Sequence, residues 1–405
     1  MAKLHRAVLS TSVIMALTIL GDSLLYPIFP LYAEQLGVPL VLAGLVLSIN
    51  RWVRLYSNYL AAKVYSSRSV YVPVLLASMG ATLSTAFYAF PVGIVGFLLA
   101  RMLWGVCFSF FRMGSYLVVL QTSQPVLGWA LGLSQAILRL GSAFTALVGG
   151  YLIDLMGYHW TMLLMALLSG FAIPLSLLLK RQLSAESVGL SEAAETVQTQ
   201  VTARGQALSR GFCYAAAFIT HLVANGLVSS SLALLLRETI GNGISVGSLT
   251  LGIATISGFV FSSHWLSAIV LSAWSGGLSD TYGRRVPFVA VTALQGSLLL
   301  LLVQASRPVV CIVSAILFFV SANMQKVFLD AALGDTTDSD NRRIVTARYN
   351  SLQDLGAALG PLIGYGLGAL SGFNTVYNLG ALVLLSTAAV PLLNQFWLRG
   401  RSVRP

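Results

Sequence analysis

Hydrophobic residues along the chain fall in long runs that are separated by short polar segments. Twelve of these runs are about twenty residues long, which is the length a helix needs to cross the hydrocarbon layer of a bilayer. They are Val8–Leu31, Leu40–Leu60, Val70–Tyr88, Gly93–Leu120, Leu131–Leu152, Thr161–Leu179, Phe212–Leu236, Leu251–Leu278, Val286–Leu302, Val309–Asp330, Tyr349–Leu370 and Val376–Leu398. The pattern predicts an all-α membrane protein with twelve transmembrane helices.

The two halves of this pattern resemble each other. A shift of 215 residues places Arg139–Phe144 over Asp354–Leu359, and each segment lies in the corresponding run of its half. The longest polar stretch lies between the two copies, from Lys180 to Arg210. We therefore expect two six-helix pseudo-repeats. The predicted parts are an N-terminal bundle over 1–180, a linker over 181–210 and a C-terminal bundle over 211–405.

Composition supports lipid as the solvent of this chain. Only 9% of the residues are charged, against about 25% in soluble domains. The three cysteines lie in separate apolar runs without metal-ligand spacing, so we expect neither a disulfide framework nor a metal site. The sequence shows no phosphate-binding loop and no nucleophile motif, so we expect no enzymatic activity and no cofactor.

The net charge of +11 reports topology rather than nucleic-acid binding. Sixteen lysines and arginines lie in the termini and one set of alternate loops, against two, Arg237 and Arg307, in the opposite set. Basic residues are enriched in cytoplasmic segments of membrane proteins. This bias predicts that both termini and the 181–210 linker are cytoplasmic, with basic side chains near lipid headgroups.

A polar segment between the eighth and ninth runs carries a family signature. Gly276-Gly277-Leu278-Ser279-Asp280-Thr281-Tyr282-Gly283-Arg284-Arg285 resembles the loop motif G-x-x-x-D-R-x-G-R-R of the major facilitator superfamily, with Thr281 in place of one arginine. Its candidate residues are Gly276, Asp280, Gly283, Arg284 and Arg285. The resemblance implies a twelve-helix secondary transporter of a bacterial inner membrane, acting as a monomer.

Two further segments resemble motifs of the same family. Arg101 and Gly105 in the fourth run match its R-x-x-x-G motif. The eleventh run contains Gly356, Gly360, Pro361 and Gly364, which resemble the family's antiporter motif. That motif belongs in the fifth run, where Thr145 and Ala146 stand at the Gly-Pro positions. The eleventh-run motif favours export, and we expect this from resemblance alone.

Nine charged residues lie inside the predicted spans, where each is costly unless it faces protein or water. The cations are Arg51, Arg54, Arg101, Arg112, Arg139 and Lys326, and the acids are Asp22, Asp330 and Asp354. Buried charges are normally paired. One interpretation is therefore three structural pairs: Asp22 with Arg51, Lys326 with Asp330, and Arg139 with Asp354.

Six cations against three acids leave a positive surplus, and this surplus favours a functional interpretation. Asp22 is the first candidate for proton coupling, with Asp330 and Asp354 next. Arg51, Arg54, Arg112, Arg139 and Lys326 are candidates for binding an anionic group of the substrate, since arginine grips carboxylates at two points. We expect proton-coupled export of an organic anion or carboxylate-rich metabolite by alternating access. The alternatives are a broad-specificity drug efflux pump, and a non-transporting receptor or assembly factor with the same scaffold.

Overall fold

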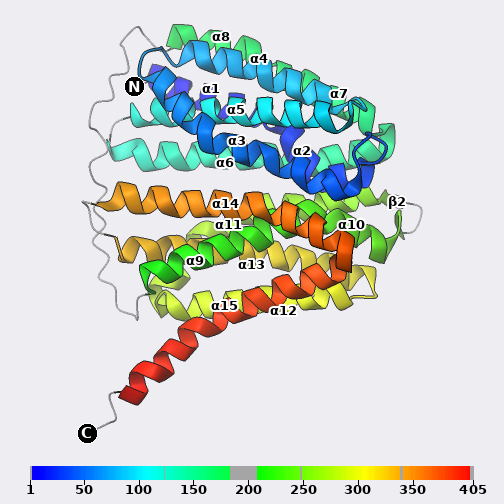
Figure 1. Cartoon of the computed structure of the whole chain (residues 1–405). Helices are drawn as coiled ribbons and strands as arrows, with labels where there is room; N and C mark the ends of the chain where they lie inside the picture. The colour runs from blue at the N-terminus through cyan, green and yellow to red at the C-terminus, as the bar shows by residue number, and fades with distance from the viewer. Residues whose placement is uncertain (1, 123, 183–207, 247–248, 338–340, 402–405) are drawn as a thin grey trace. The chain divides into compact units, whose positions relative to one another are not determined.

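The structure is a computed structural model that describes residues 2–122, 124–182, 208–246, 249–337 and 341–401 (Figure 1). The first half of the chain contains α1 (Ala2–Thr18), α2 (Leu20–Tyr32), α3 (Leu40–Tyr65), α4 (Tyr71–Tyr88), α5 (Gly93–Leu120), α6 (Gln124–Met156), α7 (Tyr158–Gly170) and α8 (Ala172–Gln182). The second half contains α9 (Arg210–Thr220), the π-helix η1 (His221–Val228), α10 (Ser229–Ile240), β1 (Gly243–Val246), β2 (Leu249–Gly252), α11 (Ile253–Tyr282), α12 (Arg285–Gln304), α13 (Pro308–Asp335), α14 (Arg342–Ser371) and α15 (Phe373–Arg401).

Each of the twelve predicted spans corresponds to one of these helices or to a consecutive set of them. The first span is α1 with α2, the sixth is α7 with α8, and the seventh is α9, η1 and α10. By length and composition, ten helical segments of the described chain can cross a membrane. The two remaining spans, α3 and α14, are 26 and 30 residues long and more polar. The prediction of an all-α, twelve-helix membrane protein is confirmed.

The contacts divide the chain into two compact units. The first unit contains α1 to α8, the β1–β2 hairpin and the start of α11 up to Trp265. The second contains α9, η1 and α10, the rest of α11, and α12 to α15. The sequence repeat places the hairpin and all of α11 in the C-terminal half, whereas the contacts group residues Asn242–Trp265 with the first unit. Of the predicted linker, 183–207 lie outside the described residues.

Small residues explain why the start of α11 packs on α6. A Cβ atom on Gly150 of α6 would meet the backbone of Ala254 and Gly258, and a Cβ on Gly258 would meet the carbonyl of Ala146. Two helix backbones approach this closely only where side chains are absent. The four residues bring α6 and α11 into direct backbone contact.

A short antiparallel hairpin precedes α11. β1 and β2 pair with Gly243 opposite Gly252, after Gly241 ends α10 with a φ of 78°. The eighth span was predicted to begin as a helix at Leu251, and that boundary is wrong because Leu251 lies in β2 and pairs with Ile244. Each strand is only four residues long, which is too short to change the hydropathy of the apolar run. The hydropathy pattern therefore gave no sign of the hairpin.

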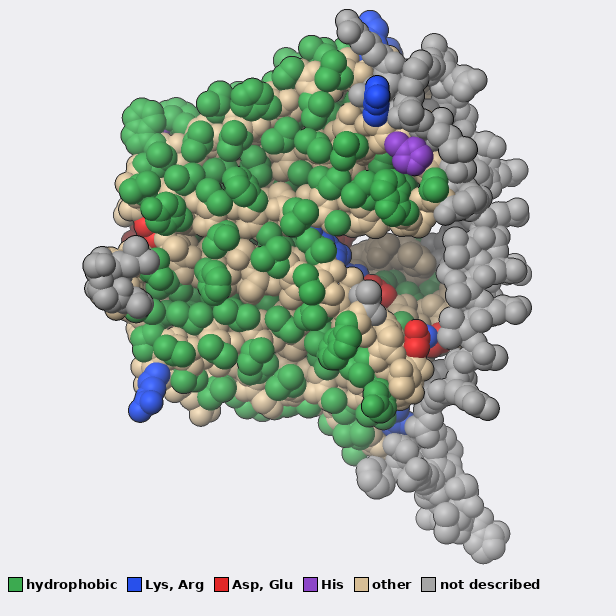
Figure 2. All heavy atoms as spheres, turned by 180° about the vertical axis from the view of Figure 1, so that it is seen from behind, with side chains coloured by type: hydrophobic (Ala, Val, Ile, Leu, Met, Phe, Trp, Pro, Cys, Tyr) green, Lys and Arg blue, Asp and Glu red, His purple; other side chains and the backbone are tan. Residues whose placement is uncertain are grey.

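The outer surface of the described helices is apolar, as contact with lipid requires. On α4, exposed large side chains recur at helical spacing at Val72, Leu76, Met79, Leu83 and Phe87. Figure 2 shows hydrophobic side chains spread over much of the visible face, with few charged side chains among them. A water-soluble protein rarely exposes an apolar surface of this extent.

Candidate functional site

Asp22 and Arg101 form an ion pair inside the first unit. The carboxylate Oδ1 of Asp22, on α2, accepts a hydrogen bond from a terminal guanidinium nitrogen of Arg101, on α5. Arg101 is 0% exposed and Asp22 is 7% exposed. Both charges are largely removed from solvent, so each depends on the other and on neighbouring polar groups for stabilisation.

The remaining donors of Arg101 are held mainly by α3. Its Nε donates to the carbonyl oxygen of Val46 at 3.2 Å, and its other terminal nitrogen donates to the carbonyl oxygen of Leu47 at 3.3 Å. The same nitrogen donates to the hydroxyl of Tyr26 at 3.2 Å, and that hydroxyl in turn donates to Leu47. These bonds fix the guanidinium independently of Asp22.

Gly105 explains the spacing of the R-x-x-x-G motif. A Cβ atom at position 105 would lie 2.6 Å from the carbonyl oxygen of Asn50 on α3. The absence of that atom lets α5 approach α3 closely enough for Arg101, one turn earlier, to reach the carbonyls of Val46 and Leu47. The motif thus combines a helix contact with a buried cation.

Asn50 adds a neutral polar group to the pair. Its side chain is 1% exposed, and its Nδ2 donates to Oδ1 of Asp22 at 3.5 Å. Asp22 therefore faces Arg101 from one helix and an amide from another. The sequence identified Asp22 and Arg101 as separate candidates but did not place them together.

The predicted pairing of Asp22 with Arg51 is wrong. Arg51 lies with its guanidinium carbon 5.3 Å from the ring centroid of Tyr26, and Arg54 lies 5.0 Å from the ring centroid of Phe108. An arginine over an aromatic face gains a cation–π attraction. Helical spacing along α3 could not show that Arg101 is the cation that reaches Asp22.

Arg112 and Arg139 differ from Arg101 in their surroundings. Arg112 shares the helix α5 with Arg101 but is exposed, whereas Arg101 is fully buried. Arg139 lies on α6 of the first unit and is half-buried. Asp354, its predicted partner, lies on α14 of the second unit and is also half-buried.

In the second unit, the predicted pairing of Lys326 with Asp330 is confirmed. The Nζ of Lys326 donates to Oδ2 of Asp330 at 2.6 Å, one turn away on α13. Tyr349 of α14, which the sequence analysis did not single out, donates its hydroxyl to Oδ1 of Asp330 at 2.8 Å. Both carboxylate oxygens of Asp330 are therefore bonded.

The loop motif between α11 and α12 is organised around Arg284. Its Nε donates to Asp335 at 2.8 Å, and one terminal nitrogen donates to Asp280 at 2.5 Å. Gly283 has a φ of 77°, which the tight turn requires and which favours glycine. The hydrogen bonds to Asp335 raise the pKa of Arg284, and the bond to Asp280 adds to this effect.

The other residues of the loop motif have simpler surroundings. A Cβ at Gly276 would meet nothing within 4 Å, so close packing does not require glycine there. Arg285, the last residue of the motif, begins α12.

Asp335 is a functional candidate that sequence reasoning missed. It is the last residue of α13, and it binds Arg284 with two side-chain oxygens, at 2.8 and 3.4 Å. The loop motif is therefore tied to α13 as well as to its own helix. The only sequence signal was a second acid near the end of the tenth run.

The glycine motif of the eleventh span packs on the π-helix. Cβ atoms on Gly356 and Gly360 of α14 would collide with the backbones of Phe218 and Gly226, and one on Gly364 would meet the side chain of Leu227. Pro361 lies inside α14, one residue after Gly360. π-helical turns are frequent at functional sites. The motif thus joins α14 to η1 through direct backbone contact.

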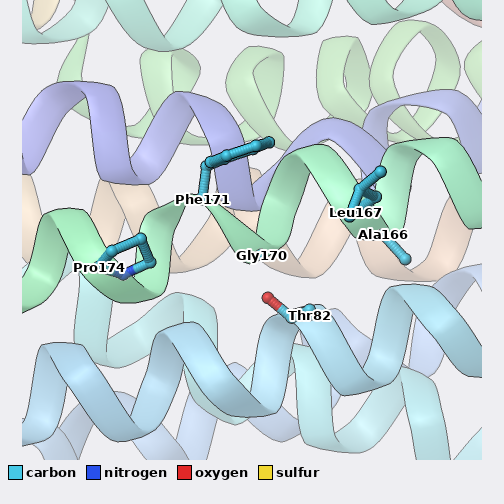
Figure 3. Close-up of a pocket in the computed structure, with 6 residues that line it drawn as sticks. All are labelled: Thr82, Ala166, Leu167, Gly170, Phe171 and Pro174. Carbon is cyan, nitrogen blue, oxygen red and sulfur yellow. The ribbon is translucent and has the colours of Figure 1, made fainter.

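A pocket of about 500 Å³ lies elsewhere in the first unit, between α4, α7 and α8 (Figure 3). It is lined by Thr82, Ala166, Leu167, Gly170, Phe171 and Pro174. The hydroxyl of Thr82 donates to the carbonyl of Ser78 within its own helix. The pocket is apolar and contains none of the charged candidates.

Comparison with known proteins agrees with this architecture. Residues 11–267 and 217–404 match the sequence profile of the Major Facilitator Superfamily. The chain is 27% identical over 376 residues to Multidrug resistance protein MdtG of Rahnella sp. (strain Y9602), covering 90% of this chain and 88% of that protein. It is 26% identical over 385 residues to the protein of the same name from Klebsiella pneumoniae (strain 342), covering 92% and 89%.

Solved structures share the fold at low sequence identity. A POT family transporter in complex with 5-aminolevulinic acid superposes with a TM-score of 0.73 at 13% identity, over 96% of this chain and 95% of that chain. A bacterial homolog of the human lysosomal transporter Spinster, in an inward-facing conformation, superposes with a TM-score of 0.72 at 11% identity, over 96% and 95%. The chain therefore belongs to the major facilitator superfamily of multi-pass membrane transporters.

Proposed function

We propose that this protein exports lipophilic organic compounds in exchange for protons, by alternating access of a central binding site. The observation that carries the proposal is the buried Asp22–Arg101 pair, a carboxylate that a proton can neutralise inside a transporter bundle. Two relatives that align over about nine-tenths of this chain are multidrug resistance proteins, which supports the class of substrate. The proposal places the chain in a bacterial inner membrane with both termini in the cytoplasm.

The surroundings of Arg101 suit it to a proton-coupling role. Arginine keeps its charge at any physiological pH. The carbonyls of Val46 and Leu47 hold its guanidinium in place whether Asp22 is ionised or protonated. Protonation of Asp22 would remove the attraction between α2 and α5 and leave α3 bound to α5. The contact between α2 and α5 is thus stronger when Asp22 is ionised than when it is protonated. A difference of this kind between two states is what couples proton binding to a conformational change.

Two intramembrane cations, Arg101 and Lys326, bind the acids Asp22 and Asp330. Two more, Arg51 and Arg54, lie on aromatic rings. Each pair removes one cation together with one acid, so the positive surplus on which the expectation of an anionic substrate depended is unchanged by pairing. Arg112 is exposed, and the anionic-substrate alternative can be tested at this residue.

Transport into proteoliposomes tests the proposal. An imposed proton gradient should drive uptake of ethidium, a lipophilic cation, into vesicles that contain the purified protein. Asp22→Asn should abolish gradient-driven uptake and retain exchange of ethidium down its own gradient. Glu34→Gln, at an exposed acid after α2, is the matched control and should transport normally.

Three outcomes would contradict the proposal in different ways. Gradient-driven uptake of a dicarboxylate without uptake of ethidium would favour the organic-anion alternative. Normal gradient-driven uptake by Asp22→Asn would remove Asp22 from proton coupling. Absence of transport and of counterflow for both probes would favour the receptor or assembly-factor alternative.

A further inference from the structure

Asn50 has one bonded and one unsatisfied end beside the ion pair. Its Nδ2 donates to Asp22 at 3.5 Å, a long hydrogen bond. Its Oδ1 is buried and has no hydrogen-bond partner among the residues that the structure describes. A buried acceptor without a donor costs free energy, so the Asn50 side chain is incompletely hydrogen-bonded when Asp22 is ionised.

A protonated Asp22 would present the donor that Asn50 lacks. The carboxylic acid carries one O–H group, and the adjacent guanidinium of Arg101 has only donors, so it cannot accept that hydrogen bond. A primary amide has both donors and an acceptor. Rotation of the Asn50 amide about its last side-chain torsion, which has broad and nearly two-fold preferences, would turn Oδ1 toward Asp22 without moving the backbone.

The backbone of Asn50 is well placed for this rotation, because it is held still. Gly105 of α5 packs directly against the carbonyl oxygen and Cα of Asn50. Asp22, which binds Arg101, lies within reach of the Asn50 amide. The Asn50 amide can therefore respond to the proton by rotation alone, without a movement of its backbone.

We propose that Asn50 is a positioning residue for the transported proton: it donates to Asp22 when the acid is ionised and accepts from Asp22 when it is protonated. This inference depends on the proposed function, since it assigns a partner to the proton that Asp22 would carry. It predicts that loss of the acceptor makes the protonated state harder to reach.

Other charged and titratable groups near Asp22 stay the same when Asn50 is changed. Tyr26 and Arg51 approach from α2 and α3, Arg101 from α5, and Tyr88 from α4. From α6, Arg139 lies one turn before Ser142, whose hydroxyl accepts a hydrogen bond from Ser23. From α7, Tyr158 and His159 lie near the far end of α2, where Tyr158 stacks on Tyr32. A change in pH dependence at position 50 therefore reports the amide itself.

The test is the pH at which gradient-driven ethidium transport is half-maximal. Asn50→Leu keeps the size of the side chain and removes both the acceptor and the donor of the amide. The donor bond to ionised Asp22 is long, at 3.5 Å, and therefore the weaker of the two, so loss of the acceptor should dominate and this pH should fall by roughly half to one unit. Asn50→Asp adds a second carboxylate beside Asp22, which favours proton uptake, so the midpoint should rise. Ser48→Ala, another buried polar position on α3, is the control and should leave the midpoint unchanged.

The two shifts in opposite directions separate a positioning role from a structural one. A structural role would lower the rate of every variant at all pH values without moving the midpoint, and that result would overturn the inference while leaving proton coupling by Asp22 intact. Transport that is independent of pH in the unmodified protein would overturn both. If Asn50→Leu does not reach the membrane, Asn50→Ala removes the same acceptor, and an unmoved midpoint in that variant would also overturn the inference.

Discussion

Asp154, at the end of α6, caps the first turn of α11 through Thr255. Its Oδ2 accepts hydrogen bonds from the backbone nitrogen of Thr255 at 2.7 Å and from its hydroxyl at 2.5 Å. A carboxylate at a helix N-terminus satisfies a backbone donor that the helix leaves open and complements its dipole. The cap therefore joins a helix of the N-terminal half of the sequence to one of the C-terminal half.

Removal of this cap should destabilise the protein by about 1 kcal/mol, the usual cost of losing an N-cap side chain. Asp154→Ala should lower the midpoint of thermal unfolding in detergent, and Asp154→Asn should lower it less, because the amide oxygen still accepts a hydrogen bond. Glu34→Ala provides an exposed acid as control. Equal midpoints for Asp154→Ala and the control would show that the cap adds no stability.

Replacing one member of the buried pair should destabilise the protein far more than replacing both members. Asp22→Ala leaves the guanidinium of Arg101 without its carboxylate, so we expect a loss of roughly 3 to 5 kcal/mol of stability. The double variant Asp22→Asn with Arg101→Gln leaves no unpaired charge and should recover most of that loss without recovering gradient-driven transport. Chemical unfolding and transport measurements on the same preparations would check this. A double variant as unstable as Asp22→Ala would mean that the two side chains stabilise the fold through more than their mutual neutralisation.

The loop motif should depend more on Asp335 than on Asp280. The side chain of Asp335 is 11% exposed and bonds Arg284 with both oxygens, whereas that of Asp280 is 58% exposed and uses one. Asp335→Asn should therefore reduce the transport rate more than Asp280→Asn. Initial rates at equal amounts of inserted protein would measure the difference. The reverse order would show that Asp280 has a role beyond its bond to Arg284.

Gly360 should tolerate no side chain, in contrast to Gly366 on the same helix. A methyl group at 360 would collide with Gly226 and Leu222 of η1, whereas one at 366 would meet nothing within 4 Å. Gly360→Ala should prevent stable folding or abolish transport, and Gly366→Ala should be silent. Yield of monodisperse protein and transport rate would report both effects. A functional Gly360→Ala variant would mean that η1 can move away from α14 far enough to accommodate a methyl group.

Arg112 tests the anionic-substrate alternative that the sequence suggested. If a substrate carries a carboxylate, Arg112→Gln should raise its apparent KM several-fold and change that of a neutral analogue much less. Arg112→Lys should restore part of the loss, since it keeps the charge but not the two-point geometry. Competition assays against ethidium would measure both values. An unchanged KM for the anion would exclude Arg112 from its recognition.

The sequence by itself determined the membrane spans and the class of the protein. Hydropathy is a local property, so runs such as Gly93–Leu120 predicted helix α5 to the residue. The loop motif was recognisable because its turn, at Gly283, and the pair Asp280–Arg284 are formed by residues four apart or closer. The pair Lys326–Asp330 was predictable for the same reason, since residues one turn apart on a helix are neighbours whatever surrounds the helix.

Only the tertiary structure decided which distant residues meet. Asp22 pairs with Arg101, 79 positions away, rather than with Arg51, because the contact of Gly105 with Asn50 brings α5 against α3 and directs Arg101 toward α2. Asp335 and Asp154 were missed for the same reason. Their partners, Arg284 and Thr255, lie 51 and 101 residues away. The facing side of a helix depends on its rotation and depth against its neighbours, and no periodicity within one helix contains that information.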